Sequence, residues 1–485
     1  MAVPRYTARL ETPSPEPNES RVNDRFHTMS RWVGGGVTAL GRVARRFRLA
    51  PDNGDASVPR ARSAAAAGRP VLRLEPPPIP NRNEARGAIR GRATLLDKCS
   101  EHTLARQVRA SGLYPYFRPI SDSEDTVVVI EGRRRIMLGS NNYLGLTHHP
   151  KVIEAAAVAL RRYGSGCTGS RFLNGTLDLH CQLEDALAKF VGKEACLIFS
   201  TGYMANLGLL AGLVSRRDVV YLDKLDHASI VDGAQLAAGD VVRFNHGDLD
   251  DLERKIAARV ERGHALIMVD GVYSMEGNIA DLPGLLRVAR RFGAALAVDD
   301  AHAVGVLGPN GEGTPAHLGV TDEVDLIAGT FSKSLASIGG FVAGSADVID
   351  YLKHHSRPLI FSASLPPAST AGTLAALEVL QTEPERRARL WENTRRLQAG
   401  FRQLGFDIGP TQTPIVPVLV GTLDRTFLFW RKLFDAGVFT NPVVPPAVPP
   451  AECRLRTSLM ATHTPEQIDA CLEAFAKIGR ELGVI

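Results

Sequence analysis

Short apolar runs alternate with helix-length segments through the middle of the chain, and this alternation constrains the fold more than any other feature. The runs are ACLIFS, VVYLD, ALIMVDG, ALAVDD and DLIAGT, and stretches such as LPGLLRVARRFG separate them. Strands that are apolar at every position are typical of parallel sheets that helices cover on both faces. The alternation therefore predicts an α/β fold whose large, mostly parallel sheet domain occupies residues 151–345.

The pattern changes on both sides of this region. Residues 96–150 are expected to form the N-terminal segment of the same folded unit. After about residue 345 the pattern becomes helical and then gives shorter strands and a last amphipathic helix, PEQIDACLEAFAKIGRELG. Residues 346–485 are therefore predicted to form a smaller C-terminal α+β domain.

Residues 1–95 differ from the rest in charge and composition. They contain 17 Arg and 8 Asp or Glu, a net charge of +9, whereas the whole chain has a net charge of +5. Their Pro, Ala and Gly content favours disorder. Within them, residues 31–49 place apolar side chains at helical spacing among arginines, and such a basic amphipathic helix can lie on an anionic membrane. The same stretch also fits a disordered Arg-rich leader or an over-long start, because three consecutive glycines at 34–36 weaken a helix.

Composition excludes several classes of protein. The chain is 44% hydrophobic and 22% charged, as in ordinary globular proteins, and it has no apolar run of about 18 residues that could span a membrane. Its first 30 residues lack the apolar core of a secretory signal. The six cysteines are scattered, which predicts neither a disulfide framework nor a metal site and favours a reducing cytoplasm.

Three polar features stand at the ends of expected strands, where open α/β sheets place their ligands. The first is the Thr-Gly turn before a helix in FSTGYMANLG, where free backbone N–H groups can hold a phosphate. The second is AVDDAHAVG, which contains Asp299 and His302. The third is GTFSKS, which contains Lys333, one of only 10 lysines in the chain.

Each of these features alone has an ordinary structural explanation, since turns, capping carboxylates and surface lysines are common. Together they describe a phosphate cradle, a carboxylate, a histidine and an amine at neighbouring strand ends. An aldehyde cofactor with a phosphate and a ring nitrogen needs this combination, because lysine forms the Schiff base and an aspartate keeps the ring nitrogen protonated.

From about residue 100 to its end, the chain resembles the α-oxoamine synthases, pyridoxal-phosphate enzymes of fold type I. Within that family it is most similar to the bacterial serine palmitoyltransferases. Nine stretches carry the resemblance in order: GSNNYLGL (139–146), GSGCTGSRFLNGT (164–176), FSTGYMANLG (199–208), DHASIVDG (226–233), DGVYSMEGNIADL (270–282), VDDAHAVG (298–305), GTFSKS (329–334), FSASLPP (361–367) and RLRTSLMATHTPEQI (454–468).

The resemblance implies roles for individual residues. Lys333 is the cofactor-linked lysine, Asp299 meets the pyridine nitrogen, His302 meets the phenolic oxygen, and His227 stacks on the ring. The implied cofactor-binding residues are, in addition, Gly202, Tyr203, Ser274, Thr330, Ser332, Ser362 and Ser364. Arg456 is implied to hold the amino acid's carboxylate, near Asn141 and Asn142. Ser362 and Ser364 are implied to reach the phosphate of the other subunit of a homodimer.

The resemblance also implies the reaction, a decarboxylative condensation of an amino acid with an acyl thioester to give an α-amino ketone. L-Serine and a long-chain acyl-CoA or acyl-carrier protein are the expected substrates, with 3-ketosphinganine as product. One departure bears on the amino acid: bacterial serine palmitoyltransferases can have a tyrosine where this chain has Asn141. Glycine, alanine or another amino acid therefore remain alternatives. A non-catalytic synthase subunit and an aminotransferase are further alternatives, disfavoured by Lys333 and by the DHAS histidine respectively.

Overall fold

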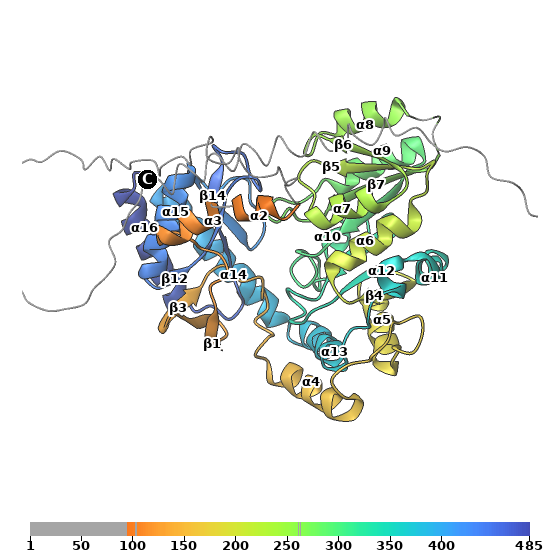
Figure 1. Ribbon diagram of the computed structural model, residues 1–485, viewed down its shortest axis with the longest axis horizontal. Helices are drawn as coiled ribbons and strands as arrows, with labels where there is room; N and C mark the ends of the chain where they lie inside the picture. The colour runs from red at the N-terminus through yellow and green to blue at the C-terminus, as the bar shows by residue number, and fades with distance from the viewer. Residues whose placement is uncertain (1–94, 102–103, 260, 262) are drawn as a thin grey trace, which may run out of the picture. The chain divides into compact units, whose positions relative to one another are not determined.

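A computed structural model of the chain describes residues 95–101, 104–259, 261 and 263–485 (Figure 1). The predicted basic extension, with its amphipathic helix at residues 31–49, lies outside the described residues except for its last position. The predictions of disorder and of membrane contact for this segment therefore stay predictions. Among the helices that the structure describes, none is both long and apolar enough to cross a membrane.

The described residues group into two compact units. One contains, in its described part, α2 (Asp97–Glu101), α3 (Leu104–Ala110) and the segment Val444–Ala451. The other contains Pro115–Val443 and Glu452–Ile485. All elements and contacts discussed below belong to this second unit.

A seven-stranded sheet organises the second unit, in the strand order β4-β10-β9-β8-β7-β5-β6. Strands β5 to β9 pair in parallel, and β10 is antiparallel to both of its neighbours, so the prediction of a mostly parallel sheet is confirmed. The strands are β4 (Ala195–Phe199), β5 (Val219–Asp223), β6 (Asp240–Phe244), β7 (Ala265–Asp270), β8 (Ala295–Asp299), β9 (Leu326–Thr330) and β10 (Gly340–Gly344).

Helices cover both faces of this sheet. Successive side chains of a strand point to opposite faces, and the side chains on both faces of these strands are mostly apolar. In β4, Leu197 and Phe199 belong to one apolar cluster, whereas Cys196 and Ile198 belong to the other. The first cluster includes side chains of α6 (Gly202–Leu213), α7 (Ala228–Leu236), α11 (Ala346–His355) and α12 (Arg357–Ile360). The second includes side chains of α4 (Pro150–Tyr163), α5 (Asp178–Phe190), α8 (Leu249–Ala257), α9 (Leu282–Phe292) and α13 (Pro367–Thr382).

Local sequence signals set the ends of these helices. In α9, the side chain of Asp281 accepts a hydrogen bond from the backbone N–H of Gly284 at 2.9 Å, and a proline occupies the first turn. The helix ends at Gly293, whose φ of 62° lies in the left-handed region that glycine adopts readily. The short α10 (Thr314–His317) follows β8.

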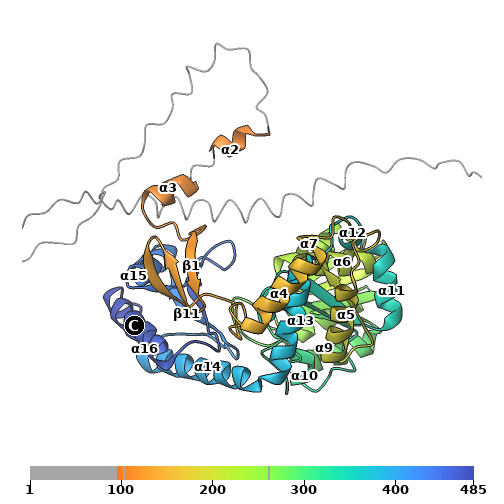
Figure 2. The same ribbon diagram turned by 90° about the horizontal axis from the view of Figure 1, so that it is seen from below.

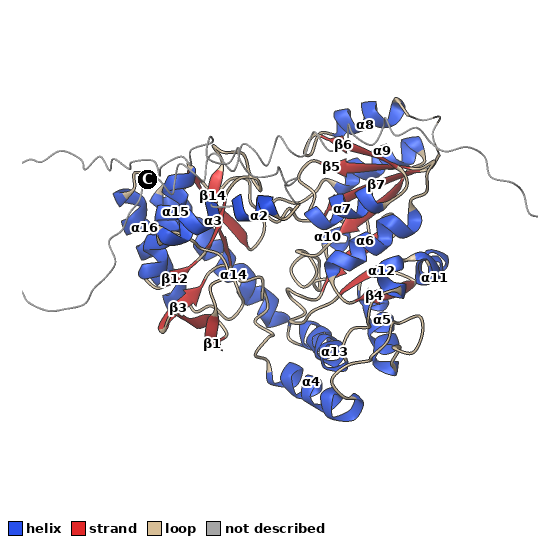
Figure 3. Ribbon diagram, viewed as in Figure 1, coloured by secondary structure: helices blue, strands red, loops and turns tan. Residues whose placement is uncertain are grey.

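Two smaller sheets lie outside the large sheet, and one of them takes three of its four strands from residues 120–137 rather than from the C-terminal part. Figure 2 shows α13 and α14 as consecutive helices that lead from the large sheet to these sheets, and Figure 3 separates helices from strands by colour. One sheet has the order β1-β2-β3-β12 and the other the order β11-β14-β13. The strands of these two sheets are β1 (Ile120–Glu124), β2 (Val127–Ile130), β3 (Arg133–Met137), β11 (Ile415–Gly421), β12 (Val438–Phe439), β13 (Asn441–Val443) and β14 (Cys453–Ser458). The helices in the C-terminal part of the chain are α14 (Pro384–Leu404), α15 (Leu423–Asp435) and α16 (Pro465–Glu481).

The parallel pairing brings the carboxyl ends of distant strands to one edge. Asp270, the last residue of β7, pairs in register with Asp299, the last residue of β8. Thr330 ends β9, the next strand along the sheet. The residues that follow these strands are therefore neighbours in space. The boundaries placed at residues 150 and 345 from sequence stay predictions.

Candidate active site

A cavity of about 290 Å³ lies at this edge of the large sheet, and it is called the strand-end cavity below. Side chains and backbone from β7, β8 and β9, from the starts of α6 and α7, and from the loop before β10 line it. Nine residues singled out in the sequence are among its lining residues: Gly202, Tyr203, His227, Ser274, Asp299, His302, Thr330, Ser332 and Lys333.

One end of the strand-end cavity suits an anion. The helix α6 begins there at Gly202, and its N-cap Thr201 accepts a hydrogen bond from Met204 N at 3.0 Å. The first N–H groups of a helix have no intrahelical partner and point toward bound anions. The hydroxyls of Thr330 and Ser332 lie 2.8 Å apart on the same wall. A Cβ at Gly202 would lie 2.8 Å from Thr330 Cβ, so only glycine lets the helix start approach this closely.

The carboxylate of Asp299 is held by hydrogen bonds to both of its oxygens. Asn206 Nδ2 donates to Oδ2 at 2.6 Å, and the backbone N–H of Ala301 donates to Oδ1 at 3.0 Å. Asp299 is buried but lines the cavity. The end of β8 and the side chain of Asn206 on α6 therefore hold the carboxylate of Asp299 in one position at the cavity wall.

His227 is the N-cap of α7, and its role as a cap determines which nitrogen of its ring carries the proton. The backbone N–H of Ser229 donates to His227 Nδ1 at 3.2 Å, and the Ser229 hydroxyl lies 2.7 Å from the same nitrogen. That hydroxyl itself accepts a hydrogen bond from Asn206 Nδ2 at 2.8 Å. Because burial lowers the pKa of His227, the ring is neutral near pH 7. Its Nδ1 is an acceptor, so its single proton is on Nε2.

His302 belongs to a second group of hydrogen-bonded side chains. Its Nδ1 lies 2.7 Å from the hydroxyl of Tyr143, whose side chain is buried. Arg456 donates from a terminal nitrogen to Asn141 Oδ1 at 3.0 Å and from Nε to the Ser274 carbonyl oxygen at 2.6 Å. Burial lowers the pKa of His302 well below its usual value, and the cations Lys333 and Arg456 lower it further.

Lys333 follows β9 in the loop that leads to β10, and its side chain faces the strand-end cavity. Burial lowers the pKa of its amine from 10.5 to about 8, although the nearby carboxylate of Asp299 opposes this effect. About a tenth of this amine is therefore unprotonated and nucleophilic at pH 7, and about half of it at pH 8. An exposed lysine lacks this property.

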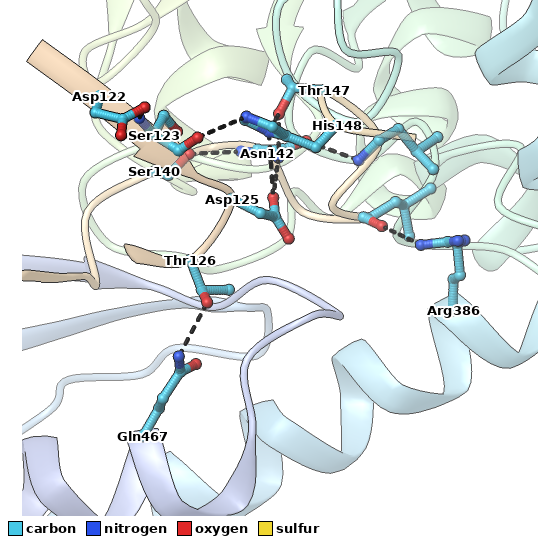
Figure 4. A network of polar contacts seen from close by, with 12 residues as sticks. Asp122, Ser123, Asp125, Thr126, Ser140, Asn142, Thr147, His148, Arg386 and Gln467 are labelled. Atoms are coloured by element: carbon cyan, nitrogen blue, oxygen red, sulfur yellow. Dashed lines mark hydrogen bonds and ion pairs between the residues drawn. The ribbon is translucent and has the colours of Figure 1, made fainter. Parts of the chain in front are cut away.

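Other predicted residues lie outside the lining of the cavity. Arg456 and Asn141 adjoin it through Ser274, as described above. Asn142 instead stabilises a loop: its Nδ2 donates to Asp125 Oδ1 at 3.1 Å and to Thr147 Oγ1 at 2.8 Å (Figure 4). Its Oδ1 accepts a hydrogen bond from the backbone N–H of Leu146.

The two predicted serines after α12 also lie outside the cavity lining. Ser364 donates to the carbonyl oxygen of Gly169 at 3.0 Å and is buried, whereas Ser362 is partly exposed. Both follow Phe361, whose side chain is 75% exposed. In this subunit they are therefore not placed to contact a ligand in the strand-end cavity.

Four residues with contacts around the site were not among the predicted site residues: Tyr143, Asn206, Ser229 and Asp270. Helical spacing was a usable signal for Asn206, because a residue four positions after Gly202 lies on the same helix face. Asp270 lines the cavity, accepts a hydrogen bond from His227 N at 3.1 Å, and has a pKa raised well above the usual value by burial and by the charges of Asp299 and Asp226.

Comparison with known proteins identifies the family. Residues 133–475 match the family described as aminotransferase class I and II. The chain is 51% identical to a serine palmitoyltransferase of Sphingobacterium spiritivorum over 80% of this chain and 97% of that protein. It is 44% identical to an 8-amino-7-oxononanoate synthase of Geobacter sulfurreducens over 78% of this chain and 98% of that protein. The chain belongs to the α-oxoamine synthase family.

Solved structures of α-oxoamine synthases agree with this assignment. The serine palmitoyltransferase of Sphingomonas wittichii superposes with a TM-score of 0.79 at 39% identity, covering 81% of this chain and 100% of that one. A serine palmitoyltransferase solved with its PLP internal aldimine gives the same TM-score, identity and coverage. The predicted fold class, a fold type I transferase of this family, is confirmed.

Proposed function

We propose that this α-oxoamine synthase is a pyridoxal 5'-phosphate (PLP)-dependent acyltransferase that condenses L-serine with a long-chain acyl thioester and releases CO₂. The product is an α-amino ketone such as 3-ketosphinganine. The observation that carries the proposal is the convergence of Lys333, Asp299, His302 and His227 on one cavity. The serine palmitoyltransferases similar to this chain support the choice of reaction.

The residues of the strand-end cavity fit PLP. The α6 start with Thr330 and Ser332 suits its phosphate, Asp299 suits its ring nitrogen, and the Lys333 amine suits its aldehyde. A volume of about 290 Å³ is at the small end of the range for small-molecule sites, which matches a cofactor with a single ring. Asn206, which holds the Asp299 carboxylate, also lines the cavity, and its Oδ1 is buried without a hydrogen-bond partner among the described residues.

PLP, when bound, supplies an aldehyde that condenses with amines and a ring that accepts the electron pair left when a bond at the amino acid's Cα breaks. Asp299 would hold a proton at the ring nitrogen, and the neutral His302 would meet the ring's phenolic oxygen. Lys333, once its amine is free, takes the proton from Cα of the amino acid and later returns one to the same carbon. Its lowered pKa makes it an effective base near neutral pH.

Arg456 is proposed to bind the carboxylate of the amino acid. Its guanidinium is buried and is now hydrogen-bonded to Asn141 and to the Ser274 carbonyl, at the border of the strand-end cavity. The side chain that holds this arginine is Asn141, the position where the family resemblance implies that a tyrosine can stand. The pair of Arg456 and Asn141 is therefore the part of the site on which the choice of amino acid depends.

Replacing Arg456 with lysine is expected to raise KM for the amino acid about 10- to 100-fold, because lysine cannot make the two-pronged, charge-assisted contact. We expect kcat to change much less. Arg454 offers a matched control: it is equally buried on the same face of β14, but its guanidinium already pairs with Glu276 and Glu452. Arg454→Lys should leave KM within about threefold of wild type, and equal effects of the two variants would contradict the assignment.

A homodimer with a shared active site is part of the proposal. Ser362 and Ser364 do not line the cavity of their own chain, and they follow the exposed Phe361. This arrangement suits a segment that contacts a second copy of the chain. Exposed apolar residues of this size are common at such interfaces.

Substrate identity decides between this reaction and its close alternatives. The purified protein, incubated with each amino acid and with palmitoyl-CoA or a palmitoylated carrier protein, should give a product of the mass expected for serine. A dominant glycine or alanine product would overturn the serine assignment and leave the reaction class intact. A protein that binds no PLP and forms no product would instead be a non-catalytic subunit.

Membrane contact through residues 31–49 also belongs to this proposal, because it would bring the enzyme to its acyl substrate. The full chain is expected to bind vesicles that contain anionic lipid more tightly than a chain that lacks residues 1–95. Sedimentation with such vesicles measures the difference. Equal binding of the two proteins would remove the membrane assignment.

A further inference from the structure

The two histidines of the strand-end cavity have the same kind of hydrogen-bond partner at Nδ1. In both, Nδ1 lies within 2.7 Å of a side-chain hydroxyl, which is Ser229 for His227 and Tyr143 for His302. For His227 the backbone N–H of Ser229 also points to Nδ1, which fixes that nitrogen as an acceptor. For His302, the donor or acceptor role of Nδ1 depends on which atom of its contact with Tyr143 carries the proton.

The neighbours of the Tyr143 hydroxyl answer this question. Its other nearby acceptor is Asn141 Oδ1, at 3.5 Å, and that oxygen already accepts a shorter hydrogen bond from Arg456. The phenolic proton therefore has one good acceptor, His302 Nδ1 at 2.7 Å. Tyr143 is buried, and burial raises the pKa of its hydroxyl, so that proton is present at neutral pH.

The charge of His302 then fixes the position of its own proton. Burial and the neighbouring cations keep the imidazole neutral, so it carries one N–H. With Nδ1 occupied as an acceptor, the proton is on Nε2. A neutral ring held in this tautomer can donate a hydrogen bond from Nε2 without adding a full positive charge beside Lys333.

We propose that Tyr143 is a positioning residue that holds His302 as the Nε2–H tautomer, so that His302 donates a hydrogen bond to the phenolic oxygen of bound PLP. This proposal rests on the proposed function, since it needs PLP in the strand-end cavity. It assigns to Tyr143 a role that acts through His302. The two rings also lie in an edge-to-face arrangement, with centroids 6.1 Å apart and an angle of 65° between their planes.

A hydrogen bond from His302 to the phenolic oxygen should change the pKa of the Lys333 nitrogen in one direction. A donor at the phenolic oxygen withdraws negative charge from beside the nitrogen that Lys333 contributes, and so lowers the pKa of that nitrogen. Loss of the donor should raise it. The other titratable or charged groups around Lys333 are not substituted in the variants below: Asp299, Asp270, Arg456 and His227.

Tyr143→Phe removes only the hydroxyl and tests the proposal on the PLP-loaded protein. The midpoint of the pH titration of its visible absorption band should rise by about one pH unit, a tenfold change in the protonation equilibrium, as expected for one lost hydrogen bond. Tyr221→Phe is the matched control, because Tyr221 is equally buried but lies outside the cavity lining. Its midpoint should equal that of the wild type.

A double-mutant cycle separates positioning from general structural damage. In a His302→Asn background, Tyr143→Phe should produce no further change in the midpoint, because its effect passes through the imidazole. An equal change in both backgrounds, or an unchanged midpoint in Tyr143→Phe alone, would overturn the proposal.

The ¹⁵N chemical shifts of histidine-labelled wild-type protein give a second measurement. His302 Nδ1 should show the chemical shift of an unprotonated nitrogen, and a protonated Nδ1 would also overturn the proposal. If the wild-type protein binds no PLP, the proposed function fails first and visibly.

Discussion

Lys333→Ala is expected to reduce turnover by at least about 10⁴-fold, because the variant loses both the cofactor-linking amine and the general base. The purified variant should also lack the visible absorption band that a covalent link between PLP and the protein produces. Lys193→Gln is the matched control. Lys193 is the other lysine whose pKa burial lowers, but its amine donates to the carbonyls of Thr321 and Val324 away from the strand-end cavity.

The pH dependence of PLP binding gives Lys333 a second readout. Only an unprotonated amine attacks an aldehyde, and burial lowers the pKa of Lys333 from 10.5 to about 8. The rate at which the PLP-free protein takes up the cofactor covalently should therefore rise about tenfold per pH unit below pH 8 and level off above it. A rise that continues toward pH 10 would show that the amine is not desolvated as the structure indicates.

The sequence predicted the large sheet because its strands are apolar at every position, which is the pattern of strands buried on both faces. It did not predict the strand order or the antiparallel placement of β10 between β4 and β9. Pairing depends on contacts between segments far apart in the chain, and no local pattern contains that information. The sequence therefore predicted the kind of sheet, whereas its connections required the structure.

The cavity residues could be selected from sequence because the carboxyl ends of parallel strands meet at one edge. Asp299, His302 and Lys333 all lie at or after such ends, so the fold class brings them to one edge of the sheet, and the pairing of β8 with β9 then makes them neighbours. Tyr143 could not be found in this way. It lies 159 residues before His302 in the sequence, outside any strand of the large sheet, and only the packed structure brings the two together.

Asn142 illustrates the opposite case. The family resemblance implied a place beside the substrate for Asn142, together with Asn141 and Arg456. In the structure its amide makes three hydrogen bonds that stabilise the loop at 142–147. Nothing in a single sequence distinguishes an asparagine that binds a ligand from one that stabilises a turn, because the same donors and acceptors suit both. A substrate role for Asn142 stays a prediction.

Asp299→Asn is expected to lower kcat about 10²- to 10³-fold, the usual cost of removing one charged group that stabilises a transition state. An amide carries no negative charge, so it cannot keep the ring nitrogen of PLP protonated, and the ring then accepts electrons poorly. The variant should still hold PLP through Lys333. Turnover with serine and palmitoyl-CoA, together with the visible absorption of the purified protein, measures the two properties separately.

The neighbouring Asp300 provides the control for this experiment. It is fully buried and does not line the strand-end cavity, and burial raises its pKa to about 7, so much of it is already uncharged at neutral pH. Its Oδ2 accepts a hydrogen bond from Thr314 N at 2.7 Å, and its Oδ1 has no hydrogen-bond partner among the described residues. An asparagine can keep the first contact and place its NH₂ group at the second position. Asp300→Asn should therefore retain most of the activity, and a loss as large as that of Asp299→Asn would mean that packing at the end of β8, rather than the charge of Asp299, limits the reaction.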